Sequence, residues 1–95
     1  MPRGYVIAHA TVTDPDAWAQ YVAKTKAVLA KFGGTPIIRG GQCEIVEGNG
    51  TKRNVVLEFP SYEAALGYAK SPEYTVARKL RDGAGQLDMT IVEGV

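Results

Sequence analysis

The stretch Tyr5-Val-Ile-Ala-His-Ala-Thr-Val12, followed closely by Asp14-Pro15, has the form of a strand that leads into a helix. The same form returns where Asn54-Val-Val-Leu-Glu-Phe59 meets Pro60-Ser61. Each helical segment then ends at glycines and leads to another strand-like run, at residues 35–46 and 87–92. Two strand–helix–strand halves predict an α+β fold of ferredoxin-like β-α-β-β-α-β order. Such a fold has an antiparallel four-stranded sheet with two helices on one face.

The ends of both helices are marked in the sequence. Asp14 can cap the first helix, Pro15 suits its first position, and Gly33-Gly34 is expected to end it. Ser61 can cap the second helix. Ser71-Pro72 predicts a break in that helix with a fresh start, because proline cannot donate the backbone hydrogen bond of a helix interior.

The second strand is expected over residues 35–46, with an interruption at Gly40-Gly41. Glycine inside a strand pattern indicates a bulge or a bend. Residues 47–53 are rich in turn-forming side chains, so we expect them to form an exposed hairpin between the second and third strands.

Composition limits what the chain can be. Ninety-five residues fit one domain, so we expect residues 1–95 to form a single unit. The net charge is +1 and the basic residues are spread along the chain, which argues against a nucleic-acid partner. The sequence has no basic amphipathic helix of the kind that binds a membrane surface. No apolar run approaches the roughly 20 residues that are needed to cross a bilayer.

The only cysteine, Cys43, cannot form a disulfide within the chain. This favours a reducing, cytoplasmic location, and the start of the chain lacks the pattern of a signal peptide. One cysteine and one histidine do not make a conventional metal site within one chain, and no nucleotide-binding fingerprint is present. We therefore expect no metal and no cofactor.

Alternating strand residues predict one uniformly apolar face, which should meet the helices. The other side, here called the helix-free face, is expected to carry Tyr5, Ile7, His9, Thr11, Val56, Glu58, Asp88, Thr90 and Val92. This face is too apolar to stay in water, and both helices are already used on the opposite face. We therefore predict a homodimer in which the helix-free faces of two copies meet.

Several short segments resemble a known family when taken together and in order: Gly4-Tyr5-Val6-Ile7-Ala8, Asp14-Pro15, Arg39-Gly40-Gly41, Glu58-Phe59-Pro60-Ser61, Ser71-Pro72-Glu73-Tyr74 and Val92-Glu93-Gly94. They are similar to the small proteins grouped as domain of unknown function 1330 (DUF1330). The resemblance implies the dimeric α+β barrel superfamily, in which two ferredoxin-like subunits pair their sheets. That superfamily includes cofactor-free monooxygenases, muconolactone-isomerase-like proteins, haem enzymes and ligand-sensing domains. The resemblance implies no particular reaction and no catalytic residue.

His9 and Glu58 are the candidate catalytic pair. His9 is the only histidine, and histidine exchanges protons near neutral pH. Glu58 is expected on the same face of a neighbouring central strand, where a carboxylate would orient the imidazole for acid–base work. The alternative is a polar pair that only satisfies its own hydrogen bonds in an interface.

Arg39, Gly40 and Gly41 are candidate substrate-binding residues. A guanidinium can hold a carboxylate through two parallel hydrogen bonds, and glycines allow a ligand close to the backbone. A salt bridge beside a bend in the sheet is the alternative. Tyr74 and Asp88 are further candidates. The simpler interpretations are that Tyr74 packs a helix onto the sheet and that Asp88 starts the last strand.

Three functions remain open from sequence. The first is a cofactor-free enzyme in which His9 and Glu58 act on a small anionic carbonyl compound held by Arg39. The second is a dimeric module that binds a small molecule without turnover. The third is a purely structural dimer.

Overall fold

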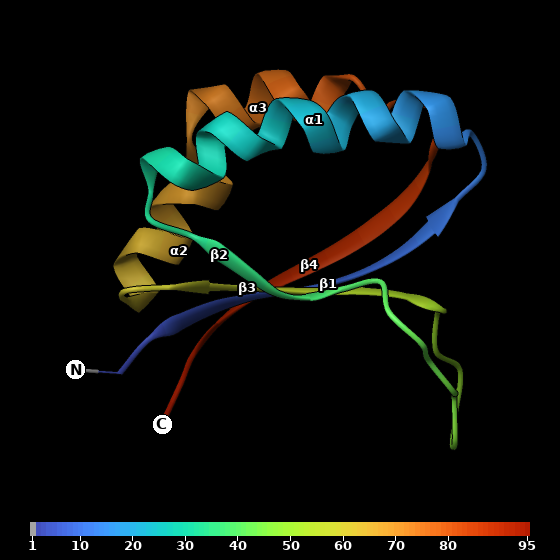
Figure 1. The fold of residues 1–95 in the computed structure, drawn as a ribbon, viewed down its shortest axis with the longest axis horizontal. Helices are drawn as coiled ribbons and strands as arrows, with labels where there is room; N and C mark the ends of the chain where they lie inside the picture. The colour runs from blue at the N-terminus through green and yellow to red at the C-terminus, as the bar shows by residue number, and fades with distance from the viewer. Residues whose placement is uncertain (1) are drawn as a thin grey trace.

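The computed structural model describes residues 2–95 and contains four strands and three helices within them. In chain order these are β1 (Gly4–Val12), α1 (Pro15–Lys31), β2 (Thr35–Arg39), β3 (Arg53–Phe59), α2 (Tyr62–Lys70), α3 (Pro72–Lys79) and β4 (Gly85–Glu93). The strands form one antiparallel sheet in the order β2-β3-β1-β4. The helices lie together on one side of it (Figure 1). The ferredoxin-like α+β fold predicted from the sequence is confirmed.

The helix ends follow the predicted capping residues. The side chain of Asp14 accepts a hydrogen bond from the amide of Ala17 at 3.2 Å, and Ser61 caps α2 in the same way. Ser71 ends α2 and caps α3, where its hydroxyl accepts from the amide of Tyr74 at 3.1 Å. The break predicted at Ser71-Pro72 is therefore confirmed.

The predicted second strand was too long. β2 ends at Arg39, and residues 40–52 form an irregular loop instead of a strand followed by a short hairpin. The loop extends to the side of the sheet away from the helices (Figure 1). Gly40 marks the turn out of the strand, since its φ of +68° is costly for other residues.

The irregularity in the ladder lies earlier than the glycines, between Pro36 and Ile38. One extra residue there, Ile37, changes which side chains face the helices. Pro36 pairs with Leu57 and Arg39 pairs with Val55, so both lie on the helix-covered face although they are three residues apart.

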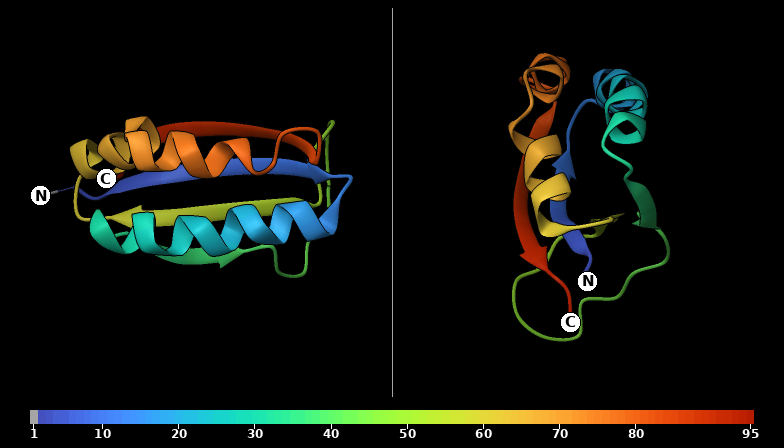
Figure 2. Two further views of the ribbon diagram at one scale, coloured as in Figure 1. Left: turned by 90° about the horizontal axis from the view of Figure 1, so that it is seen from above. Right: turned by 90° about the vertical axis from the view of Figure 1, so that its left-hand side faces the viewer.

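The buried core lies between the sheet and the helices. Its largest members come from β1, β3 and all three helices: Val6, Leu57, Phe59, Trp18, Tyr21, Val28, Tyr68 and Tyr74. The α1 helix and the α2–α3 pair lie side by side over the sheet (Figure 2). α1 packs closely on α3 and approaches no strand as closely, which leaves room between α1 and the sheet.

Candidate functional site

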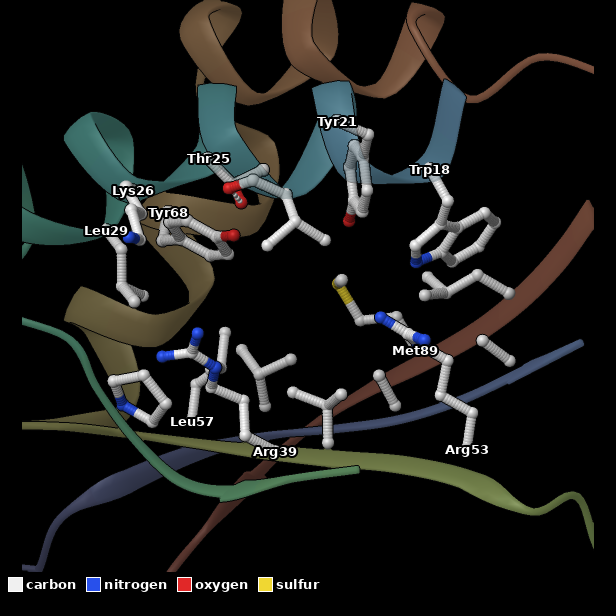
Figure 3. Close-up of a pocket in the computed structure, with 17 residues that line it drawn as sticks. Trp18, Tyr21, Thr25, Lys26, Leu29, Arg39, Arg53, Leu57, Tyr68 and Met89 are labelled. Carbon is white, nitrogen blue, oxygen red and sulfur yellow. Dashed lines mark hydrogen bonds between the residues drawn. The ribbon is translucent and has the colours of Figure 1, made fainter. Parts of the chain in front are cut away.

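A cavity of about 320 Å³ lies between α1 and the sheet (Figure 3). Its floor is the helix-covered face of the sheet, and its roof is the inner side of α1 together with Tyr68 of α2. The residues that line it are Val6, Ala8, Ala10, Trp18, Tyr21, Val22, Thr25, Lys26, Leu29, Pro36, Arg39, Arg53, Val55, Leu57, Tyr68, Leu87 and Met89. Small alanines on β1 and the distance of α1 from the sheet leave this space open.

Three basic side chains form the rim of the cavity. Lys26 comes from α1, Arg39 from the end of β2 and Arg53 from the start of β3. All three residues are exposed. Within residues 2–95 the ion pairs are Arg3–Glu58 and Lys31–Glu73, so no rim cation has a carboxylate within 4.0 Å. The rim therefore carries positive charge that the chain itself does not neutralise.

The inner wall presents two tyrosine hydroxyls. Tyr21 and Tyr68 are both buried, and their hydroxyl oxygens point toward the cavity (Figure 3). Burial raises the pKa of Tyr21 far above its usual range, and the neighbouring Tyr74 hydroxyl raises this pKa further. Burial is also the main cause that raises the pKa of Tyr68. Both groups therefore stay protonated at neutral pH and can donate hydrogen bonds.

These raised pKa values predict loss of stability in alkali. In the unfolded chain tyrosines ionise near the reference pKa of 10.0, whereas buried Tyr21 and Tyr68 stay neutral. Their contribution to the free energy of unfolding is thus complete below pH 10 and is lost as pH rises further. In an absorbance titration, at least two of the five tyrosines should ionise only as the protein unfolds. Full ionisation of all five with native structure intact would contradict this.

His9 lies away from the cavity. It is exposed on the helix-free face, where its Nδ1 donates to Oδ1 of Asn54 at 2.6 Å. Asn54 also donates to Sγ of Cys43 at 3.3 Å. Asp88 lies opposite His9 on β4 and is also exposed.

Glu58 is not near His9. Its carboxylate accepts hydrogen bonds from Arg3 at 2.7 Å and from Tyr5 at 3.0 Å, near the beginning of β1. Glu58 pairs with Tyr5 and Asn54 pairs with His9, so the two predicted catalytic side chains are separated by roughly 13 Å along the strand. The expectation that these side chains lie close together was wrong, because strand register separates them.

The other predicted site residues are also divided between regions. Arg39 lies at the rim of the cavity. Beyond it, Gly40 and Gly41 have open space around the position of a Cβ atom, so no close approach requires glycine there. Tyr74 is buried behind the cavity and hydrogen-bonds Tyr21 at 2.8 Å. The expectation that His9, Arg39 and Glu58 line one cavity was wrong, since Arg39 is on the opposite face of the sheet from the other two.

Most of the cavity was not predicted from the sequence. No role in binding was expected for Trp18, Tyr21, Lys26, Arg53 or Tyr68. One signal was present: Lys26 shares a helix face with Val22 and Leu29, and Arg53 precedes an apolar strand. A basic residue in line with a core-facing stripe marks the border of that face.

Within residues 2–95 no group of three His, Cys, Asp or Glu side chains is arranged to hold a metal ion. None of the helices in that part of the chain is long and apolar enough to cross a membrane.

The model of the family described as "Domain of unknown function (DUF1330)" matches residues 3–95. The curated proteins give no significant match. Solved structures share the fold at low identity. A protein of unknown function from Rhodopseudomonas palustris is 18% identical, with a TM-score of 0.76 over 99% of this chain and 83% of that chain.

Two further structures extend the comparison. A dimeric ferredoxin-like protein of unknown function from Thermobifida fusca is 15% identical, with a TM-score of 0.62 over 97% of this chain and 91% of that chain. A protein described as an antibiotic biosynthesis monooxygenase is 12% identical, with a TM-score of 0.57 over 100% of this chain and 97% of that chain. At these identities the likeness establishes the fold alone.

Proposed function

The chain belongs to the DUF1330 family, and on that premise we propose that it binds a small organic anion in the cavity between α1 and the sheet. The basic rim suits an anionic group at one end of the ligand, and the apolar walls suit a hydrophobic body. The cavity of about 320 Å³ lies within the range of roughly 300–1,000 Å³ that is usual for small-molecule sites.

The unneutralised rim carries the proposal. Lys26, Arg39 and Arg53 come from three different elements, line the same cavity and are all exposed to solvent. Like charges gathered in this way repel one another, so an anion bound between them is favoured. The two guanidinium groups can each bind a carboxylate through paired hydrogen bonds.

The interior explains why the ligand should also be apolar. Most of the lining is aliphatic or aromatic, and its charged groups are the three basic side chains of the rim. Burying an apolar ligand surface against such walls is favourable, by roughly 25 cal/mol per Å². The lining contains no carboxylate, imidazole or thiol to act as a base, so binding is better supported than acid–base catalysis.

Titration with 2-naphthoate tests the proposal, because this fluorescent anion combines a carboxylate with a flat apolar body. The protein should bind it saturably. Arg39→Met should weaken binding about tenfold, since a charge-assisted hydrogen bond contributes about 1.5–3 kcal/mol before solvent screening. Lys52→Met is the matched control, because it removes one exposed positive charge that does not line the cavity.

Two results would count against the proposal. One is the absence of saturable binding to the wild-type protein. The other is equal weakening by Arg39→Met and Lys52→Met, because that would assign the attraction to net charge rather than to the rim.

Homodimerisation through the helix-free face is the second part of the proposal. The face presents Ile7, Ile38, Val56 and Val92 among its polar groups, and Ile38 and Val92 are 49% and 40% exposed in the single chain. The loop of residues 40–52 extends toward this side and exposes Val46 at 85% (Figure 1). A second copy is the favoured partner, because fold neighbours from Thermobifida fusca and Bacteroides fragilis are described as dimeric.

Cofactor-free chemistry on the bound anion is the second candidate function. The buried hydroxyls of Tyr21 and Tyr68 favour it, since such donors stabilise the oxygen of an enolate that forms when solvent hydroxide removes an α-proton. A fold neighbour described as an antibiotic biosynthesis monooxygenase supports an enzymatic role for this fold.

Hydrogen–deuterium exchange tests this second candidate. The α-hydrogens of an acetyl-substituted naphthoate should exchange faster in deuterated water with the protein than with Tyr21→Phe. If exchange with saturating wild-type protein is no faster than in buffer alone, the protein binds the anion but does not catalyse this reaction.

A further inference from the structure

Behind the cavity, Arg81 lies against the aromatic residues of the inner wall. Its guanidinium carbon is 5.1 Å from the ring centre of Tyr21 and 5.8 Å from that of Trp18. The Nε atom of Arg81 is buried and has no hydrogen-bond partner within the described chain. A partly buried cation held against neutral aromatic rings needs a reason beyond packing, because leaving a buried donor unpaired is costly.

The guanidinium acts on a pair of hydroxyls. Tyr21 and Tyr74 share a hydrogen bond of 2.8 Å between their hydroxyl oxygens. Burial lowers the pKa of Arg81, but the nearby hydroxyl oxygens of Tyr74 and Tyr21 outweigh burial and raise it. Arg81 therefore places a fixed positive charge beside the hydroxyl pair of Tyr21 and Tyr74.

Burial of Tyr74 sets the direction of this hydrogen bond. One hydroxyl of the pair donates to the other, and the proton of the second must find a partner elsewhere. If Tyr21 donated, the proton of buried Tyr74 would have no acceptor among the hydrogen bonds of the described residues, which is costly. Tyr21 consequently accepts within the protein, and its own proton is free.

We infer that Tyr21 is a hydrogen-bond donor aimed into the cavity, and that the preferred ligand is an organic acid with a carbonyl or similar oxygen acceptor at its buried end. The position of the hydroxyl supports this, because it points into the cavity from the buried wall (Figure 3). This inference rests on the proposed function, since the acid group of the same ligand occupies the basic rim. Arg81 and Tyr74 are positioning residues that act through Tyr21.

A matched pair of probes tests the inference. 6-Acetyl-2-naphthoate and 6-ethyl-2-naphthoate have the same carboxylate and nearly the same shape, but only the first has a ketone. Tyr21→Phe should weaken binding of the acetyl probe about fivefold and leave the ethyl probe unchanged, because it removes one hydroxyl and little volume. Tyr62→Phe is the control, since Tyr62 does not line the cavity.

A spectroscopic readout separates donation from packing. The ¹³C resonance of a labelled ketone carbon should move downfield when the acetyl probe binds the wild-type protein. Tyr21→Phe should abolish that movement, and Arg81→Met should reduce it. Tyr62→Phe should leave it unchanged.

The outcomes distinguish the two proposals. If neither naphthoate binds the wild-type protein, the proposed function fails and this inference fails with it. If both bind and Arg39→Met weakens both, but Tyr21→Phe weakens neither selectively, only the inference is overturned. A loss of ketone preference in Tyr68→Phe instead of Tyr21→Phe would also overturn it, because the donor would then be Tyr68.

Discussion

Gly85→Ala is expected to lower the free energy of unfolding by about 3 kcal/mol or more, a large part of what a domain this small has. Gly85 begins β4 with a φ of +152°, a conformation that is strained for any other residue. A Cβ atom there would lie 2.1 Å from the carbonyl oxygen of Thr11 on the neighbouring strand. Backbone cannot move aside as a flexible side chain can, so β1 and β4 would have to separate. Urea denaturation measures the loss.

Two other glycines provide matched controls. Gly40→Ala keeps the strain of a positive φ but meets nothing within 4 Å, so it should cost about 1–2 kcal/mol. Gly41→Ala has neither cost and should change stability by less than about 0.5 kcal/mol. Equal losses of stability in Gly40→Ala and Gly85→Ala would show that the close contact with Thr11 does not contribute to the loss. A neutral Gly85→Ala would contradict the described pairing of β4 with β1.

Ile7→Lys is expected to convert the proposed dimer to a monomer and to raise its dissociation constant by at least about 100-fold. Ile7 lies near the middle of β1 on the helix-free face, opposite Val56 on β3 and Thr90 on β4. In a pair of facing sheets a lysine there would be buried near its symmetry copy, which costs several kcal/mol. Sedimentation velocity over a dilution series measures the change.

Ala23→Lys is the control for this substitution. Ala23 is exposed on α1, and α1 lies on the opposite side of the sheet from the helix-free face (Figure 1). The control should therefore sediment like the wild-type protein. A wild-type protein that sediments as a 10.2 kDa particle at every concentration would contradict the proposed dimer.

The fold could be predicted because each of its signals is local. Asp14, Ser61 and Ser71 cap helices through contacts only three residues away, and the break at Pro72 follows from its missing amide proton. The alternation along β1 also depends only on strand geometry, and it correctly assigned Ile7 and His9 to the helix-free face.

The site could not be predicted because it depends on register and on the space between layers. His9 and Glu58 share a face, but the pairing of β1 with β3 places them near opposite ends of it. The side chain of Arg39 reaches the cavity through the extra residue at Ile37, which no simple alternation reveals. The cavity itself exists because α1 packs on α3 and stands away from the sheet.

A crystal structure of the protein with 2-naphthoate would show where the anion binds. We expect a naphthalene ring between α1 and the sheet, beside Tyr21 and Met89, with its carboxylate against Arg39 or Arg53. Naphthoate bound on the helix-free face beside His9, with the cavity left empty, would contradict this expectation.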